Sequence, residues 1–215
     1  KKMIAIFDME GVLIDGEFLP ELAKRVGKEK EVTELTIKGI AGEISWEEGI
    51  LKRIDLVKGA NYEDCVEISK NMQFMKGAKE TCNELKKMGF TIAVVSGGFD
   101  LLSDRLTKEL NLDYMFSNTI TFKNNSIDSI IMNVNSDKAK VIKPILDQLK
   151  EKMSNIVATV DGANDLKLLD IAGLKIAFNA KPVVQEHADV MINQKDLTLI
   201  LPHIKKKFES LKNHY

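Results

Sequence analysis

The sequence predicts an α/β protein with a doubly wound, Rossmann-like parallel sheet and a small helical cap domain inserted after the first strand. Two observations predict the sheet: short, β-branched apolar runs recur along the chain, and helical patterns with apolar residues three and four apart separate them. Alternation of strands and helices is typical of parallel sheets with helices on both faces. A third observation, a long helical stretch without a convincing strand, predicts the insertion.

Five apolar runs are expected to form buried parallel strands. They cover residues 3–7, 91–95, 156–160, 174–178 and 189–192. Four of them are followed within a few residues by Gly, Ser, Asn or Asp, which end strands. Between residues 116 and 136, two further apolar segments flank Lys-Asn-Asn-Ser and predict a hairpin with an architectural role.

The stretch of residues 15–75 contains only helical patterns. Within it, Ser45-Trp-Glu-Glu48 has the capping-box pattern that opens a helix, and residues 61–73 predict another helix. An insertion at this point of the chain would lie over the open edge of the sheet, where a lid belongs. We therefore expect a helical cap domain over 15–75 and a core domain formed by 1–14 and 76–215.

Composition restricts the classes of partner and compartment. Lys plus Arg (31) nearly balances Asp plus Glu (32), so the global charge favours neither nucleic acid nor an anionic membrane, and a small-molecule partner is expected. No apolar run approaches the ~20 residues of a membrane helix. The two cysteines, Cys65 and Cys82, lack Cys-x-x-Cys spacing, which favours a reducing cytoplasm over a zinc site or a disulfide framework.

Two carboxylates, Asp8 and Glu10, follow the first predicted strand. Side chains alternate along a strand, so both are expected to leave the sheet edge on the same side, where open α/β sheets bind ligands. One carboxylate can then attack a substrate while the other transfers protons. Taken alone, however, acidic residues after a strand more often cap the next helix or lie in solvent.

Three more polar groups follow at intervals that suit strand-helix units: Ser96-Gly-Gly, Lys138 and Asp161-Gly-Ala-Asn-Asp. Each has a structural alternative, namely a turn, a surface lysine and a capped loop, but their joint occurrence argues against three coincidences. Pro144 lies inside the helical pattern that follows Lys138. It predicts that this helix begins close to residue 143, with Lys138 in the approach or in a distorted first turn.

In their order and spacing these four motifs resemble the haloacid dehalogenase superfamily of phosphotransferases. Over nearly its full length the chain is similar to the phosphoserine phosphatase family within that superfamily. Further segments support the resemblance: Val-Val-Ser96-Gly-Gly-Phe-Asp100, Ala172-Gly-Leu-Lys-Ile-Ala-Phe178, Ala180-Lys-Pro182, Glu17 and Arg53.

The resemblance implies catalysis through an aspartyl phosphate. Asp8 would displace an alkoxide from phosphorus, and Glu10 would protonate that alkoxide and later deprotonate the hydrolytic water. The cofactor would be Mg2+, held by Asp8, by the backbone carbonyl of Glu10 and by Asp161, with Asp165 as an additional carboxylate around the metal.

The resemblance also assigns residues that bind the phosphoryl group. Ser96 and the Gly97 amide would hold a phosphoryl oxygen at a helix N-terminus. Lys138 would neutralise the phosphoryl group and the nucleophile, and Asn164 would assist binding.

Two cap residues, Glu17 and Arg53, match family positions that contact the substrate ammonium and carboxylate, which implies L-phosphoserine as the substrate. Two departures from the family pattern argue against assigning the family's activity to this chain unchanged. Glu10 stands where aspartate is usual, and Val160 stands where glycine is usual. The extra methylene of Glu10 moves the proton donor by roughly 1 Å, a displacement that can cost about 10²-fold in rate. The alternatives are a phosphatase or phosphotransferase for another small metabolite, or a phospho-ligand-binding relative disabled at Glu10.

Overall fold

A computed structural model of the chain describes residues 2–212 and contains a seven-stranded sheet in the order β4-β3-β2-β1-β5-β6-β7. Every neighbouring pair is parallel except β3 and β4, which form the predicted hairpin. The predicted doubly wound α/β sheet is thus confirmed. The strands are β1 (Met3–Phe7), β2 (Phe90–Phe99), β3 (Tyr114–Lys123), β4 (Ser126–Ile131), β5 (Ile156–Val160), β6 (Leu174–Phe178) and β7 (Val190–Ile192).

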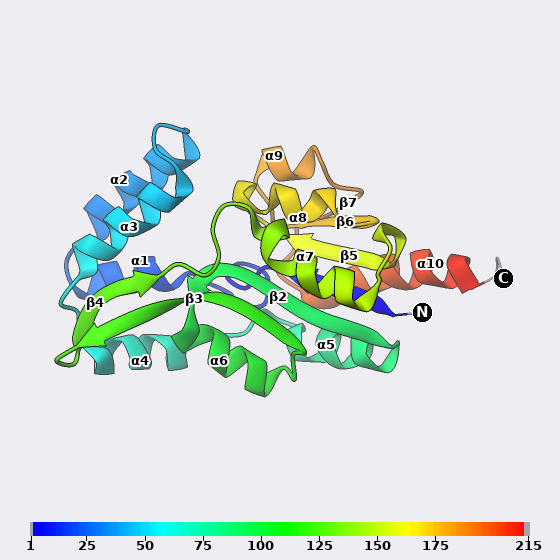
Figure 1. Cartoon of the computed structure of the whole chain (residues 1–215), viewed down its shortest axis with the longest axis horizontal. Helices are drawn as coiled ribbons and strands as arrows, with labels where there is room; N and C mark the ends of the chain where they lie inside the picture. The colour runs from blue at the N-terminus through cyan, green and yellow to red at the C-terminus, as the bar shows by residue number, and fades with distance from the viewer. Residues whose placement is uncertain (1, 213–215) are drawn as a thin grey trace.

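Helices cover both faces of the sheet (Figure 1). One face packs against α5 (Ala78–Lys87), α6 (Asp100–Glu109) and α10 (Leu201–Lys212), and the other against α7 (Lys138–Leu149), α8 (Leu166–Asp170) and α9 (Pro182–Gln185). Short 3₁₀ turns occupy Met153–Asn155, Ala163–Asp165 and Leu197–Ile200. No helix in the described part of the chain has the length and apolar character needed to cross a membrane.

A cluster of buried apolar side chains lies on each face of the sheet, which explains why the strand sequences are continuously apolar. Along β1, Ala5 and Phe7 belong to one cluster, whereas Ile4 and Ile6 belong to the cluster on the other face. A strand that is buried on both faces needs apolar side chains at every position, because neither face meets water. The central strands therefore gave a clear signal in the sequence.

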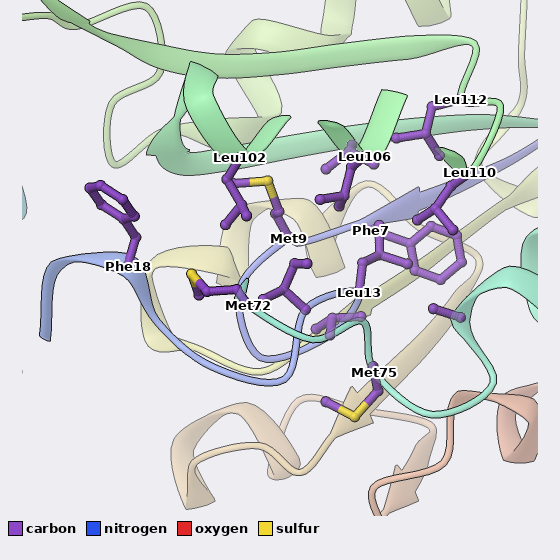
Figure 2. Packing of buried hydrophobic residues seen from close by; sticks show 14 of the residues in the cluster. Phe7, Met9, Leu13, Phe18, Met72, Met75, Leu102, Leu106, Leu110 and Leu112 are labelled. Atoms are coloured by element: carbon purple, nitrogen blue, oxygen red, sulfur yellow. The ribbon is translucent and has the colours of Figure 1, made fainter. Parts of the chain in front are cut away.

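Apolar side chains also anchor the loop that leaves β1 toward the candidate site. Met9 and Leu13 are fully buried and join the cluster that includes Leu102 and Leu106 of α6 (Figure 2). Met9 lies between Asp8 and Glu10 in the sequence, so its burial holds the backbone between these carboxylates in place.

Four helices occupy the stretch that was predicted to be helical: α1 (Phe18–Arg25), α2 (Glu29–Ile40), α3 (Trp46–Val57) and α4 (Tyr62–Asn71). As predicted, Ser45 caps α3, with its Oγ accepting a hydrogen bond from the Glu48 amide at 3.1 Å. Helices α2 and α3 project away from the sheet, whereas α4 lies along α6 (Figure 1). The start of α4 is tied to the β3-β4 hairpin, since the Tyr62 amide donates to the Asn125 carbonyl at 2.9 Å.

The predicted start of the helix after Lys138 is wrong. Helix α7 begins at Lys138 itself and contains Pro144 in its interior. Pro144 cannot donate to the carbonyl of Lys140, but Lys140 is exposed, so water can satisfy that carbonyl. Asp137 caps the helix by accepting a hydrogen bond from the Lys140 amide at 3.3 Å, which places the start of α7 earlier than the proline indicated.

Candidate active site

Lys138 is the buried centre of the candidate site. Its side chain is 1% exposed, and its ammonium lies 3.1 Å from Asp8 Oδ1 and 2.5 Å from Asp165 Oδ1. A buried charge is costly unless it is paired, and here one cation joins two carboxylates from different ends of the chain. Burial opposes the charged form of Lys138, but Asp165 and Asp8 outweigh it and raise its pKa.

Asp8 has the properties of a carboxylate that stays ionised. Burial opposes its ionisation, but the charge of Lys138 and hydrogen bonds from Asp161, Asp165 and the Met9 amide lower its pKa below the usual value. The Met9 amide donates to Asp8 Oδ1 at 2.8 Å. Lys138 and this amide therefore both bind Oδ1 of Asp8, just after the end of β1. These two contacts fix the orientation of the carboxylate.

Three carboxylates, Asp8, Asp161 and Asp165, each offer an oxygen within 4.8 Å of the others. Burial and the neighbouring charge of Asp8 raise the pKa of Asp161 to about 10 and that of Asp165 to about 7. Such crowding of like charge is relieved by a proton or by a hard cation, for which carboxylate oxygens are suitable ligands. Gly11 keeps the space open, since a Cβ there would lie 2.1 Å from Asp161 Oδ2. The donor set therefore fits a divalent cation.

Glu10 lies beside this cluster and faces the inserted helices. Its Oε1 accepts a hydrogen bond from the amide of Phe18, the first residue of α1, at 3.1 Å. Burial raises the pKa of Glu10 to about 7, with the charges of Glu17 and Asp8 adding to the rise and the Phe18 amide and Arg53 opposing it. A carboxyl group with a pKa near neutrality can both give and take a proton, which suits acid/base chemistry.

The backbone of Ser96, Gly97 and Gly98 forms an irregular segment rather than a helix start. Pairing of β2 with β3 breaks between Val95 and Phe99, and α6 begins only at Asp100. The expected location of Ser96 at a helix N-terminus is therefore wrong. Buried Ser96 instead accepts a hydrogen bond on Oγ from the Gly98 amide at 2.8 Å. Irregular strand ends of this kind commonly present backbone groups to a ligand.

Close approach of neighbouring atoms favours glycine at positions 97 and 98. A Cβ on Gly98 would lie 3.0 Å from Ser96 Oγ and 3.4 Å from Glu10 Oε1, so this segment lies close to Glu10. A Cβ on Gly97 would lie 2.4 Å from Cζ2 of Trp46, which shows that the indole ring packs on the glycine backbone.

The two cap residues that were predicted to bind substrate are brought toward Glu10. Glu17 is exposed just before α1, and Arg53 is half-buried on α3, where its Nε donates to the Gly49 carbonyl at 3.2 Å. Burial lowers the pKa of Arg53, while the charges of Glu17 and Glu10 oppose that effect. The charges of Glu10, Glu17 and Arg53 therefore interact, and two of these residues come from the inserted segment.

The segment after β5 places the remaining predicted residues. Val160, the last residue of β5, is fully buried in an apolar cluster, so the branched side chain fits the strand where glycine is usual. Asp165 Oδ2 accepts from the Gly162 amide at 3.1 Å and shapes the turn. Asn164 is half-buried in that turn, and its Oδ1 lies 2.6 Å from where a Cβ on Gly162 would be.

One buried residue of this region, Asn118, was not among the site residues predicted from the sequence. It is fully buried and joins the Ser96 segment to the chain that leads to Lys138: Nδ2 donates to the Gly97 carbonyl at 3.1 Å, and Oδ1 accepts from the amides of Asn133 and Val134 at 2.7 and 2.8 Å. The sequence gives only a weak signal for it, because Asn118 lies between two other polar residues, Ser117 and Thr119. The burial of its amide, which must satisfy its hydrogen bonds, appears only in the structure.

Comparisons of this chain with a family sequence model and with known proteins indicate the same family. Residues 2–173 match the sequence model of the haloacid dehalogenase-like hydrolases. The chain is 35% identical over 209 residues to the phosphoserine phosphatase of Methanocaldococcus jannaschii, an alignment that covers 95% of this chain and 99% of the relative. It is 38% identical over 200 residues to the phosphoserine phosphatase of Archaeoglobus fulgidus, covering 92% of this chain and 58% of that relative.

Solved structures give the same result. A phospho-aspartyl intermediate analogue of a phosphoserine phosphatase superposes with a TM-score of 0.88 at 34% identity, covering 94% of this chain and 99% of the other. A substrate-bound phosphoserine phosphatase superposes with a TM-score of 0.89 at 33% identity, covering 94% and 98%. The likeness therefore spans both the sheet and the inserted helices.

Proposed function

Because this chain belongs to the haloacid dehalogenase-like hydrolase family, we propose that it hydrolyses a phosphomonoester, with L-phosphoserine as the favoured substrate, through phosphorylation of Asp8. The observation that carries the proposal is the buried Lys138 ammonium between Asp8 and Asp165, beside Asp161. A buried carboxylate that remains ionised next to a cation is suited to attack phosphorus, because its charge is stabilised in place.

In the proposed reaction, an Asp8 oxygen forms a bond to phosphorus while the bond to the substrate oxygen breaks. Glu10 in its acid form gives a proton to the departing oxygen, and the resulting carboxylate then takes a proton from water as that water attacks the aspartyl phosphate. The products are the alcohol and inorganic phosphate, and Asp8 is regenerated. The position of Glu10 beside the Ser96 segment and near Asp8 supports these roles.

Four residues are proposed to bind the phosphoryl group. Ser96 and the Gly97 amide would donate to one phosphoryl oxygen, Lys138 would neutralise the negative charge, and Asn164 would support binding from the turn after β5. The irregular backbone after Val95 supports the role of the first two, because it leaves their amides outside the strand pairing.

We propose Mg2+ as the cofactor, held by Asp8, Asp161, Asp165 and the Glu10 carbonyl. When bound, the ion would polarise the phosphoryl group and offset its charge. The crowded carboxylates and the open space beside Gly11 support this assignment.

Addition of Mg2+ is expected to raise the melting temperature, and by more at about pH 8 than at about pH 6, because the ion displaces protons from carboxyl groups of raised pKa. Differential scanning fluorimetry at matched ionic strength measures both shifts. Asp161→Asn is expected to lose most of the response. An equal response in that variant, or a larger shift at the lower pH, would contradict the assignment.

Glu17 and Arg53 are proposed to select the substrate by pairing with its ammonium and carboxylate. Arg53→Met is then expected to lower kcat/KM for L-phosphoserine roughly 10- to 100-fold but to leave phosphoethanolamine, which has no carboxylate, within about threefold. Glu17→Gln is expected to impair both esters, since both carry the ammonium. Steady-state phosphate release checks these ratios, and equal losses on both esters in Arg53→Met would refute carboxylate recognition by that residue.

We further propose that residues 15–75 act as the cap domain and that 1–14 and 76–215 form the catalytic core. Contacts of the inserted helices with both Glu10 and Gly97 support a cap that encloses the substrate. The cytoplasm is the proposed compartment, supported by both cysteines of the sequence, Cys65 and Cys82, being buried free thiols.

A further inference from the structure

The first turn of α3 contacts the core at two neighbouring residues. Trp46 packs its ring on the backbone of Gly97, in the segment proposed to bind phosphate. Glu47 accepts a hydrogen bond on Oε1 from the amide of Ser136 at 2.9 Å, although 89 residues separate them in the sequence. One helix end thus contacts both the end of β2 and the loop before α7.

The Ser136 contact lies close to Lys138. Ser136 is separated from Lys138 only by Asp137, which caps α7 by accepting from the Lys140 amide. Hydrogen bonds from Ser136 lower the pKa of Glu47, so the contact favours a charged acceptor. A charged acceptor makes such a bond stronger than a neutral one.

Within α3 itself, few other side chains make polar contacts with the core. Over the described residues of that helix, the other side-chain hydrogen bonds and ion pairs stay within it: Arg53 donates to the Gly49 carbonyl, and Lys52 lies 2.9 Å from Glu48. Helix α4 differs, because Arg105 of α6 donates to the carbonyl of Ser69 at 2.8 Å. The far end of α3 is held at β4, because the Gly59 amide just after the helix donates to the Ile127 carbonyl at 3.0 Å. The first turn is therefore the polar anchor of α3 at the candidate site.

We propose that Glu47 is a positioning residue that fastens α3 to the loop before Lys138 and so keeps Trp46 seated on Gly97. The contact exists only when α3 lies over the site, so it stabilises that arrangement relative to one in which α3 has moved away. Its effect on turnover rests on the proposed phosphatase function, whereas its effect on the seating of Trp46 does not.

The seating of Trp46 can be measured directly, because it is the one tryptophan of the sequence. Glu47→Ala removes a hydrogen bond to a charged group and is expected to shift the equilibrium by roughly 10-fold toward the arrangement in which α3 has moved away. Trp46 is then more exposed, so acrylamide quenching of its fluorescence should increase. Glu47→Gln keeps an oxygen acceptor and is expected to restore most of the protection. Glu48→Ala is the matched control, since it removes an adjacent first-turn acid that pairs only within α3.

Steady-state kinetics provide the second readout. Glu47→Ala is expected to lower kcat/KM for L-phosphoserine about 3- to 10-fold, mainly through KM, with partial rescue in Glu47→Gln and no change in Glu48→Ala. If the wild-type chain hydrolyses no phosphomonoester, the proposed function fails while the quenching experiment still decides the role of Glu47. Unchanged quenching in a folded Glu47→Ala protein, or an equal increase in Glu48→Ala, would overturn the inference.

Discussion

Asp8→Asn is expected to lower phosphate release by at least about 10³-fold, because an uncharged amide cannot replace the attacking carboxylate. The substitution preserves the shape of the side chain and removes one of the two anionic partners of buried Lys138. Asp165 remains to pair with Lys138, so we expect the variant to fold. Phosphate release measured with excess enzyme gives the range needed to quantify so large a loss.

Asp15→Asn is the matched control for this substitution. It makes the same chemical change on the same loop, but Asp15 is exposed and pairs with Lys195, which lies outside the candidate site. We expect its activity to stay within about twofold of the wild type. Comparable residual activity in the two variants would show that Asp8 is not the nucleophile.

Glu10→Gln is expected to lower turnover of alkyl phosphates by about 10²- to 10⁴-fold, since glutamine can neither protonate the leaving alkoxide nor accept a proton from water. Its amide oxygen can still accept from the Phe18 amide, so the contact with α1 is retained. The loss should therefore report proton transfer rather than a displaced helix.

The choice of leaving group distinguishes the two roles proposed for Glu10, protonation of the leaving oxygen and deprotonation of water. An aryl phosphate with an acidic leaving group needs no proton donor, so Glu10→Gln should still form the aspartyl phosphate and release one equivalent of phenol in a burst, followed by slow hydrolysis. Rapid-mixing absorbance measures that burst. A variant that loses the burst as well, or that retains full turnover of alkyl esters, would contradict the assigned role. Absence of turnover in the wild type would favour the interpretation of Glu10 as a disabling change.

The sheet was predictable because its signal is local. Strands such as β1 and β5 are buried on both faces, so their sequences are continuously apolar, and the residues that end them follow directly. The start of α7 was not predictable in the same way. Pro144 indicated a later start, but the exposed position of Lys140 and the cap at Asp137 allow the helix to begin at Lys138.

In the candidate site, too, the residues with a local sequence signal could be predicted and those that depend on distant contacts could not. Asp8 and Asp161 follow strands that lie side by side, so strand order alone predicts that they meet. Lys138 needed the family spacing, because a lone lysine gives no sign that it will be buried. Asn118 and Glu47 depend on contacts between distant segments, and nothing near either residue in the sequence indicates which loop it holds.

Covalent phosphorylation of Asp8 during turnover is the step that tests the proposed mechanism most directly. We would mix the wild-type protein and Mg2+ with L-phosphoserine, quench in acid within the first turnover, and map the peptides by mass spectrometry. We expect release of inorganic phosphate together with one phosphoryl group on the peptide that carries Asp8, and neither in Asp8→Asn. Phosphate release without that adduct, an adduct on another residue, or no release from L-phosphoserine would contradict the proposed mechanism.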